Sequence, residues 1–194
     1  YIDFHQWNHY CDIAGRGNCA ALYTELYPYV DKCWIGEGFD YNETPEFWLT
    51  EISGIPFGVM SEMMDTGNEY RGLTFGMTHR LGWETNESDP LDIWKIFDDY
   101  DLGEAELIGW WDDRNDVVLS NYAVRATEYI LKDKKYVAVA NFSSDEQETE
   151  IYMKGDERYS FYAPDIERFQ RGQTVCGSVK LKGGEGLFLI VNKK

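Results

Sequence analysis

Basic residues are scarce in this sequence, and long apolar runs are missing. The 194 residues hold 18 Lys plus Arg against 35 Asp plus Glu, which gives a formal net charge of −17. Nucleic-acid backbones and anionic membrane surfaces both attract clustered Lys and Arg, so this balance argues against either as the partner. No run of 18 apolar residues occurs, so we expect no membrane span.

The usual motifs for metals and cofactors are missing as well. The four cysteines form no CxxC pair and have no histidine at ligand spacing, and no glycine-rich GxGxxG loop follows a strand. We therefore expect no metal and no cofactor. Cys11 and Cys19 flank a glycine-containing loop and could close a local disulfide, but Cys33 and Cys176 leave three full pairings open.

Charge divides the chain into two parts. Residues 1–116 hold 24 Asp plus Glu against 6 Lys plus Arg, whereas residues 117–194 hold 11 against 12. This break predicts two domains with a boundary at residue 116.

The first part alternates between strand-like and helix-like segments. Helices are predicted over 18–30, with an apolar stripe at Leu22, Leu26 and Val30, over 44–52 after the N-cap Thr44, and over 89–100 after the N-cap Asp89. The apolar, glycine-broken stretch 53–64 fits either a helix or a packed loop. Strands are predicted over 1–8, 32–41, 71–83 and 105–113.

This order is typical of a parallel α/β architecture. Four strands that each end in polar or aromatic residues favour the C-terminal half of a (β/α)8 barrel, with an open doubly wound sheet as the competing fold. The second part has short alternating strands separated by Asp, Ser and Gly turns, which predicts a small antiparallel β-sandwich. The expected fold class is therefore α/β plus all-β, with a partial barrel over 1–116 and a β-sandwich over 117–194.

Aromatic residues make up 16% of the chain, with 7 Trp and 14 Tyr. Most of them are expected to pack in a core, but Trp and Tyr rings also stack on sugar rings, and carboxylates accept hydrogen bonds from sugar hydroxyls. An acidic, aromatic-rich domain therefore favours a carbohydrate partner.

Four stretches resemble a known protein family. They are similar to the C-terminal part of large bacterial glycoside-hydrolase-like proteins and comprise "YIDFHQWN", "WIGEGFDY" followed by "EISGIPFG", "RGLTFGMTHRLGW" and "DPLDIWKIFDDYDLGEAELIGWW". In that family a (β/α)8 barrel precedes a small β-domain, as in α-galactosidase-like and α-amylase-like enzymes. The resemblance implies a glycosidase barrel that lacks its N-terminal half.

The resemblance also directs attention to the carboxylates after the second strand. Glycoside hydrolysis needs a carboxylic acid and a carboxylate, and barrel enzymes place functional groups at the C-terminal ends of strands. We expect Glu37 as the general acid, with Asp40 as the alternative acid or as an acceptor for sugar hydroxyls. Because three residues separate the two, a regular strand would point them to opposite sides, so they are not expected to form one catalytic pair unless the chain bends between them. The resemblance implies that the second catalytic carboxylate lies before Tyr1. In the non-catalytic alternative, Glu37 is a carboxylate at a strand edge and Asp40 caps the following loop.

Polar and aromatic residues near the strand ends are predicted to bind substrate. Glu51 and Glu62 stand in apolar surroundings, where burial would raise the pKa of either, although an exposed helix side is the commoner position. Trp111 is expected to pack between the domains. The predicted substrate-binding residues are His5, Trp7, Asn8, Trp34, Tyr41, His79, Arg80, Trp110 and Asp112.

The sequence thus predicts part of a glycoside hydrolase that acts on an oligo- or polysaccharide by carboxylate acid/base chemistry. A catalytically inactive carbohydrate-binding protein is the alternative, and a β-domain that binds sugar is a further one. The sequence begins without Met or a charged leader, which suggests a segment of a longer protein. The resemblance implies a bacterial protein, and its location stays open, with a secreted or periplasmic one favoured. Alone, this segment is expected to be inactive and to pair with the missing half-barrel or with another copy, because a half barrel leaves strand edges open.

Overall fold

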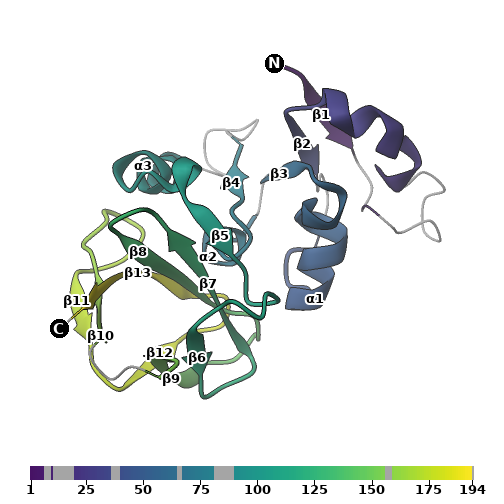
Figure 1. Cartoon of the computed structure of the whole chain (residues 1–194). Helices are drawn as coiled ribbons and strands as arrows, with labels where there is room; N and C mark the ends of the chain where they lie inside the picture. Colours follow the sequence, from purple (N-terminus) through teal and green to yellow (C-terminus); the bar gives the residue numbers. More distant parts are fainter. Residues whose placement is uncertain are drawn as a thin grey trace.

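The computed structural model describes residues 1–6, 10, 20–35, 40–64, 67–80, 90–155 and 159–193. These residues form one parallel and two antiparallel sheets, so the protein is a mixed α/β and sheet-rich molecule (Figure 1). Among the described residues, no helix combines the length and the apolar character needed to cross a membrane.

The parallel sheet has four strands in the order β1-β2-β3-β4. Their bounds are β1 Asp3–Gln6, β2 Lys32–Ile35, β3 Met60–Met63 and β4 Thr78–His79. β1 and β2 confirm a strand within each of the predicted ranges 1–8 and 32–41, and β4 lies within 71–83. β3 lies in the stretch 53–64, for which a helix or a loop was expected; its glycines lie before the strand and let the chain turn into it. The described part of this sheet does not close into a barrel.

Helical segments alternate with these strands. They are η1 Ala20–Tyr29, α1 Pro45–Phe47 continued by η2 Trp48–Ile52, η3 Ile55–Phe57, α2 Glu69–Leu73, α3 Leu91–Asp99 and η4 Leu102–Glu104. Thr44 caps α1 as predicted, because its side-chain oxygen accepts a hydrogen bond from the Phe47 amide at 3.2 Å. The expected N-cap of α3, Asp89, lies outside the described residues.

Two expectations about helices and strands need correction. The segment 18–30 is helical at η1 as predicted, but η1 is a kinked 3-10 segment in which Leu22 and Leu26 are exposed and Tyr27 is buried. A 3-10 segment has three residues per turn, so an apolar stripe spaced for an α-helix does not stay on one face. Residues 69–73 form the helix α2, although the strand pattern was extended back to residue 71; the Asn68 side chain caps this helix by accepting from the Arg71 amide at 2.9 Å.

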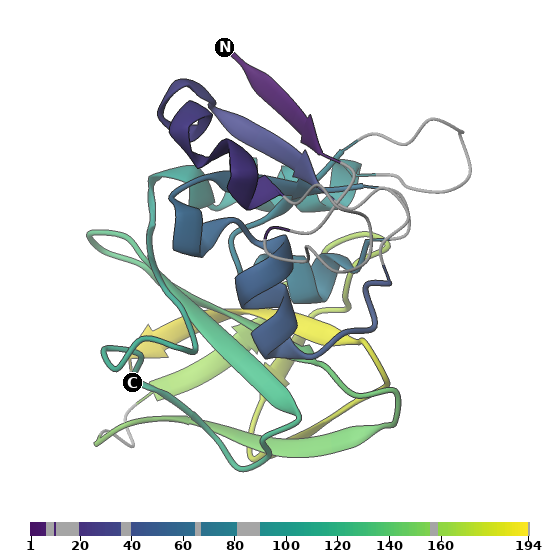
Figure 2. The ribbon, with the colours of Figure 1, turned by 90° about the vertical axis from the view of Figure 1, so that its right-hand side faces the viewer.

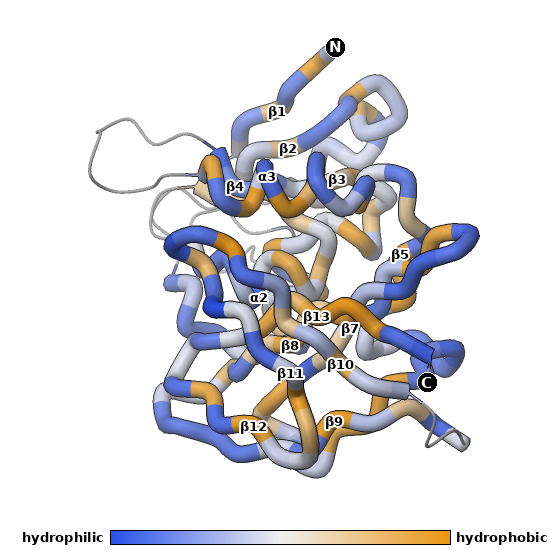
Figure 3. The backbone as a smooth tube through the Cα atoms, turned by 90° about the vertical axis from the view of Figure 1, so that its left-hand side faces the viewer, coloured by the Kyte–Doolittle hydropathy of each residue, from blue (hydrophilic) through white to orange (hydrophobic). Residues whose placement is uncertain are grey.

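The antiparallel half contains the remaining strands. A six-stranded sheet has the order β11-β10-β13-β8-β7-β5, and a three-stranded sheet has the order β12-β9-β6. Their bounds are β5 Glu106–Ile108, β6 Val117–Leu119, β7 Val124–Ile130, β8 Lys135–Asn141, β9 Gln147–Met153, β10 Tyr159–Ala163, β11 Gln173–Val175, β12 Ser178–Leu181 and β13 Gly186–Lys193. The two sheets enclose an apolar core that includes Val137, Ile151 and Leu189, and Figure 3 shows the apolar stretches of β9, β12 and β13 around it.

The strand β5 corrects one prediction about the sheets. The segment 105–113 was expected to supply the fourth strand of the parallel sheet, but β5 pairs antiparallel with β7. Alternating apolar residues fit a strand in either sheet, so the sequence pattern did not determine which sheet β5 joins. The proposed domain boundary at residue 116 stays a prediction.

The parallel sheet and the antiparallel half pack closely against each other (Figure 2). Trp48 and Trp111 each stack on Phe75, with ring centroids 5.7 and 5.5 Å apart, so Trp111 packs between the two parts as expected. The Thr127 hydroxyl also donates to the Thr74 carbonyl at 2.7 Å. These contacts fix the parallel sheet relative to the antiparallel half.

Candidate functional site

The alternation of side chains along the parallel strands gives the sheet two different faces. Phe4, Cys33 and Ser61 are in register on neighbouring strands and share one face. Phe4 packs against Tyr23 of η1, and the Tyr10 hydroxyl lies 2.8 Å from Ser61 Oγ. Burial raises the pKa of the Cys33 thiol to about 12, so this covered face holds the thiol in its neutral form.

The opposite face carries a row of polar and aromatic side chains. His5, Trp34, Glu62 and Thr78 come from β1, β2, β3 and β4, and each is in register with the next. We call these four residues the polar row. The row spans the sheet on the side that η1 does not cover, and in a closed barrel this side would be the interior.

Glu62 supplies the carboxylate of the polar row. Its side chain is 5% exposed, and it forms an ion pair with Lys32 Nζ at 2.9 Å while Thr78 Oγ1 donates to Oε1 at 3.1 Å. Burial alone would lower the pKa of Lys32, but the hydrogen bond and the charge of Glu62 outweigh it and leave that pKa raised. Lys32 therefore keeps its charge at neutral pH beside the Glu62 carboxylate.

Trp34 supplies the aromatic surface of the row. Its ring lies 6.2 Å from that of His5, and the Arg80 guanidinium lies 4.9 Å from its ring centroid. The buried indole Nε1 of Trp34 has no hydrogen-bond partner among the described residues. Three predicted substrate-binding residues, His5, Trp34 and Arg80, are thus brought together on one face.

His79 does not join them, although it precedes Arg80 in the chain. It is in register with Met63, on the face opposite the polar row, and is 3% exposed. Its Nε2 donates to the Met64 carbonyl at 2.5 Å, and its own carbonyl accepts from Trp94 Nε1 at 2.9 Å. The side chain of His79 therefore links β4 to the end of β3.

The loop after β2 holds two further predicted residues. Asp40 is exposed, and its carboxylate accepts a hydrogen bond from the Asn42 amide at 2.9 Å. Tyr41 is 4% exposed, and its hydroxyl accepts from the Met64 amide at 3.1 Å, so it anchors the loop to β3. Its carbonyl accepts from the buried Arg71, whose pKa is lowered by burial. The predicted residues Glu37, Trp7 and Asn8, together with Cys11 and Cys19, lie outside the described residues.

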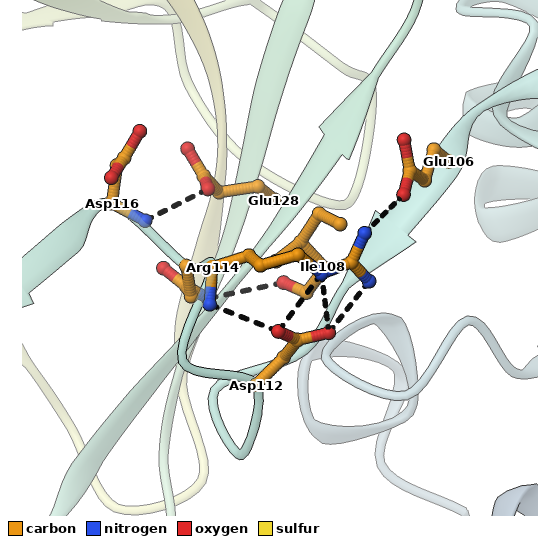
Figure 4. Close-up of polar contacts among 7 residues, drawn as sticks. Glu106, Ile108, Asp112, Arg114, Asp116 and Glu128 are labelled. Carbon is orange, nitrogen blue, oxygen red and sulfur yellow. Dashed lines mark hydrogen bonds and ion pairs between the residues drawn. The ribbon is translucent and has the colours of Figure 1, made fainter.

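Trp110 and Asp112 lie in the turn after β5 and therefore follow a strand of the antiparallel half. The Asp112 carboxylate accepts hydrogen bonds from Arg114, which also forms an ion pair with Glu106 at 2.7 Å (Figure 4). These hydrogen bonds hold the pKa of Asp112 below its usual value. The expectation that both residues end a fourth parallel strand was wrong, because β5 belongs to the other sheet.

Sequence reasoning missed Lys32 as a site residue and noted Glu62 only for its apolar surroundings. A single acid within the apolar run "VMSEMM" was the available signal for Glu62. Its pairing with Lys32 depends on the register between β2 and β3, which no sequence pattern gave.

Comparison with protein families decides what kind of protein this is. The model of the glycoside hydrolase 123 TIM-barrel domain matches residues 1–82, and the model of the glycoside hydrolase 123 C-terminal domain matches residues 89–192. The chain belongs to glycoside hydrolase family 123. The predicted resemblance to a glycoside-hydrolase family with a barrel and a C-terminal domain is thereby confirmed.

Individual proteins are less similar to this chain than the family 123 models are. No curated protein matches the chain. Similar solved structures include a GH30 endoxylanase from Clostridium papyrosolvens, with 12% identity over 87% of this chain and a TM-score of 0.41. Another is a glycoside hydrolase family 30 subfamily 8 xylanase from Clostridium acetobutylicum, with 10% identity over 86% of this chain and a TM-score of 0.38. The chain covers 50% and 49% of those two proteins, about half the length of each.

Proposed function

We propose that the complete protein hydrolyses glycosidic bonds of an oligo- or polysaccharide by carboxylate acid/base chemistry, with the polar row as part of its substrate cleft. The observation that carries the proposal is the row itself, which combines an indole, an imidazole and a held carboxylate on one sheet face of a family 123 chain. Parallel barrels bind substrate at the C-terminal ends of their strands. Half a barrel would supply only part of such a cleft, so activity is proposed for the complete protein.

Each group of the row has a distinct proposed role. The Trp34 ring provides a surface for a sugar ring. Glu62, paired with Lys32, accepts hydrogen bonds from sugar hydroxyls. Because Lys32 Nζ and Thr78 Oγ1 already engage its carboxylate, we do not assign Glu62 as the acid that protonates the leaving oxygen.

We assign that step to Glu37, with Asp40 as the alternative acid. Both belong to the segment after β2, at the C-terminal end of a strand that contributes Trp34 to the row. The second catalytic carboxylate of the pair is proposed to lie outside these 194 residues. Whether it acts as nucleophile or as base for water depends on the distance between the two carboxyl groups.

The test is hydrolysis of a panel of aryl glycosides by the complete protein. Loss of a general acid lowers the rate roughly 10²–10⁴-fold, so we expect Glu37→Gln to lower kcat by that factor. Glu25→Gln, at an exposed position on η1, is the matched control and should leave kcat unchanged.

Two outcomes would change the assignment. A large loss with Asp40→Asn and none with Glu37→Gln would move the role of acid to Asp40. Glycan binding without turnover of any sugar would instead support a catalytically inactive carbohydrate-binding protein.

A further inference from the structure

A groove in the antiparallel half lies on elements other than those of the polar row. It has a volume of about 420 Å³ and is bounded by the turn after β5, by β6 and by the start of β7. Val117, Leu119 and Ala126 supply apolar lining. A groove of this size, with an apolar base and a few polar groups, suits a small ligand or one unit of a polymer.

Tyr122 lines this groove and is 91% exposed, more than any other large apolar side chain among the described residues. Within the described part of the chain, its hydroxyl makes no hydrogen bond and its ring makes no ring contact. Its backbone carbonyl accepts from Arg125 Nη1, which ties the residue to β7. An exposed aromatic ring on an anchored backbone offers a flat contact surface at low entropic cost.

Trp110 and Arg125 form the inner wall of the groove. The Arg125 guanidinium lies 5.0 Å from the Trp110 ring centroid and forms an ion pair with Glu46 of α1 at 3.2 Å. Both side chains line the groove.

The charges of the groove favour a neutral ligand. Asp112 and Asp113 balance Arg125 and Lys154 among the lining residues, so neither a phosphate nor a polycation meets a surface of opposite charge. Asp112 is engaged by Arg114, whereas the exposed carboxylate of Asp113 has no ion pair or hydrogen bond within the described residues. A free carboxylate accepts hydrogen bonds from hydroxyl groups.

We propose that this groove binds a neutral glycan, with one sugar ring stacked on Tyr122 and sugar hydroxyls donating to Asp113. The choice of a carbohydrate rests on the proposed function, while binding here requires none of the catalytic carboxylates. The groove gives the C-terminal part of the chain a glycan contact of its own, separate from the cleft of the barrel.

The test measures binding of the 194-residue chain to an array of neutral oligosaccharides, followed by calorimetry with the oligosaccharide that binds most tightly. Tyr122→Ala is expected to weaken binding at least about tenfold, as the loss of an aromatic anchor does. Tyr152→Ala is the matched control, because Tyr152 is a 48% exposed tyrosine of β9 that does not line the groove. It should leave the affinity unchanged.

Two outcomes would overturn the proposal. Binding that survives Tyr122→Ala but is lost in Trp34→Ala would place the glycan on the polar row and rule out the groove as its binding site. Failure to bind any neutral oligosaccharide would also rule out a glycan site in the groove. Tyr122-dependent binding in a complete protein without hydrolytic activity would support the groove and contradict the proposed function, whereas hydrolysis without such binding would do the reverse.

Discussion

The ion pair between Lys32 and Glu62 holds a carboxylate that is only 5% exposed, so its removal has a predictable cost. Lys32→Met leaves Glu62 buried without its cation, and we expect the free energy of unfolding to fall by about 3 kcal/mol. Urea unfolding at pH 7 measures this loss. Arg114→Met breaks an exposed pair and should cost less than about 1 kcal/mol. Equal losses in the two variants would contradict the prediction.

The direction of the Lys32 pKa shift predicts how the stability contribution of this ion pair depends on pH. Pairing raises the pKa of Lys32 in the folded state. Its contribution is therefore fully present below the pKa of an unfolded lysine, about 10.4, and is lost as the pH rises through the higher folded value. The difference in the free energy of unfolding between the wild type and Lys32→Met should stay constant from neutral pH to about pH 10.4 and shrink above that pH.

At this scale, sequence reasoning found residue types but not their neighbours. His5, Trp34 and Arg80 were predicted to bind sugar and do lie on one face, while their role stays a prediction. Glu62 and Lys32 meet only because β2 and β3 pair with Lys32 opposite Met60 and Trp34 opposite Glu62. That register is set by the whole sheet, so the sequence of either strand alone could not reveal the pair.

Between η2 and β3 the chain turns at Gly54, and this turn allows a prediction about an element. Gly54 has a φ of +76°, and a Cβ there would lie 2.4 Å from the Val59 carbonyl oxygen and 2.7 Å from Ser61 Oγ. Gly54→Ala is therefore expected to cost more than the roughly 1–2 kcal/mol of left-handed backbone strain alone. Gly58→Ala is the control, since its φ is +69° and no atom lies within 4 Å of the added Cβ. Thermal unfolding of the two variants compares them, and a smaller loss in Gly54→Ala would contradict the steric argument.

The elements of the antiparallel half were easier to predict than the parallel sheet. Strands such as β8, β9 and β13 alternate or are apolar over seven or eight residues between clear turns. In contrast, β3 and β4 have four and two residues, and their position depends on contacts with neighbouring strands. The helix α2 was missed because its five residues show no helical period, and Asn68 was not recognised as its cap.

At the scale of the whole molecule, the open parallel sheet determines how this chain should behave in solution. Within the described residues, β1 and β4 each have one unpaired edge, and Tyr1, Ile2 and Met60 are 87%, 54% and 55% exposed. Unpaired edges beside exposed apolar side chains favour pairing with another chain. A complementary half-barrel in the complete protein, or a second copy of this chain, would cover them.

We therefore expect the isolated chain to associate with itself and to lack hydrolytic activity. Light scattering coupled to size exclusion should give a mass that rises with concentration above the 22.6 kDa of one chain. Met60→Lys places a charge on the open face of β3 and should shift the equilibrium toward single chains, because association would bury that charge. Tyr152→Lys, at an exposed position of β9 away from the parallel sheet, should leave the mass unchanged. A chain that stays at 22.6 kDa at every concentration and cleaves aryl glycosides would show that the open sheet needs no partner.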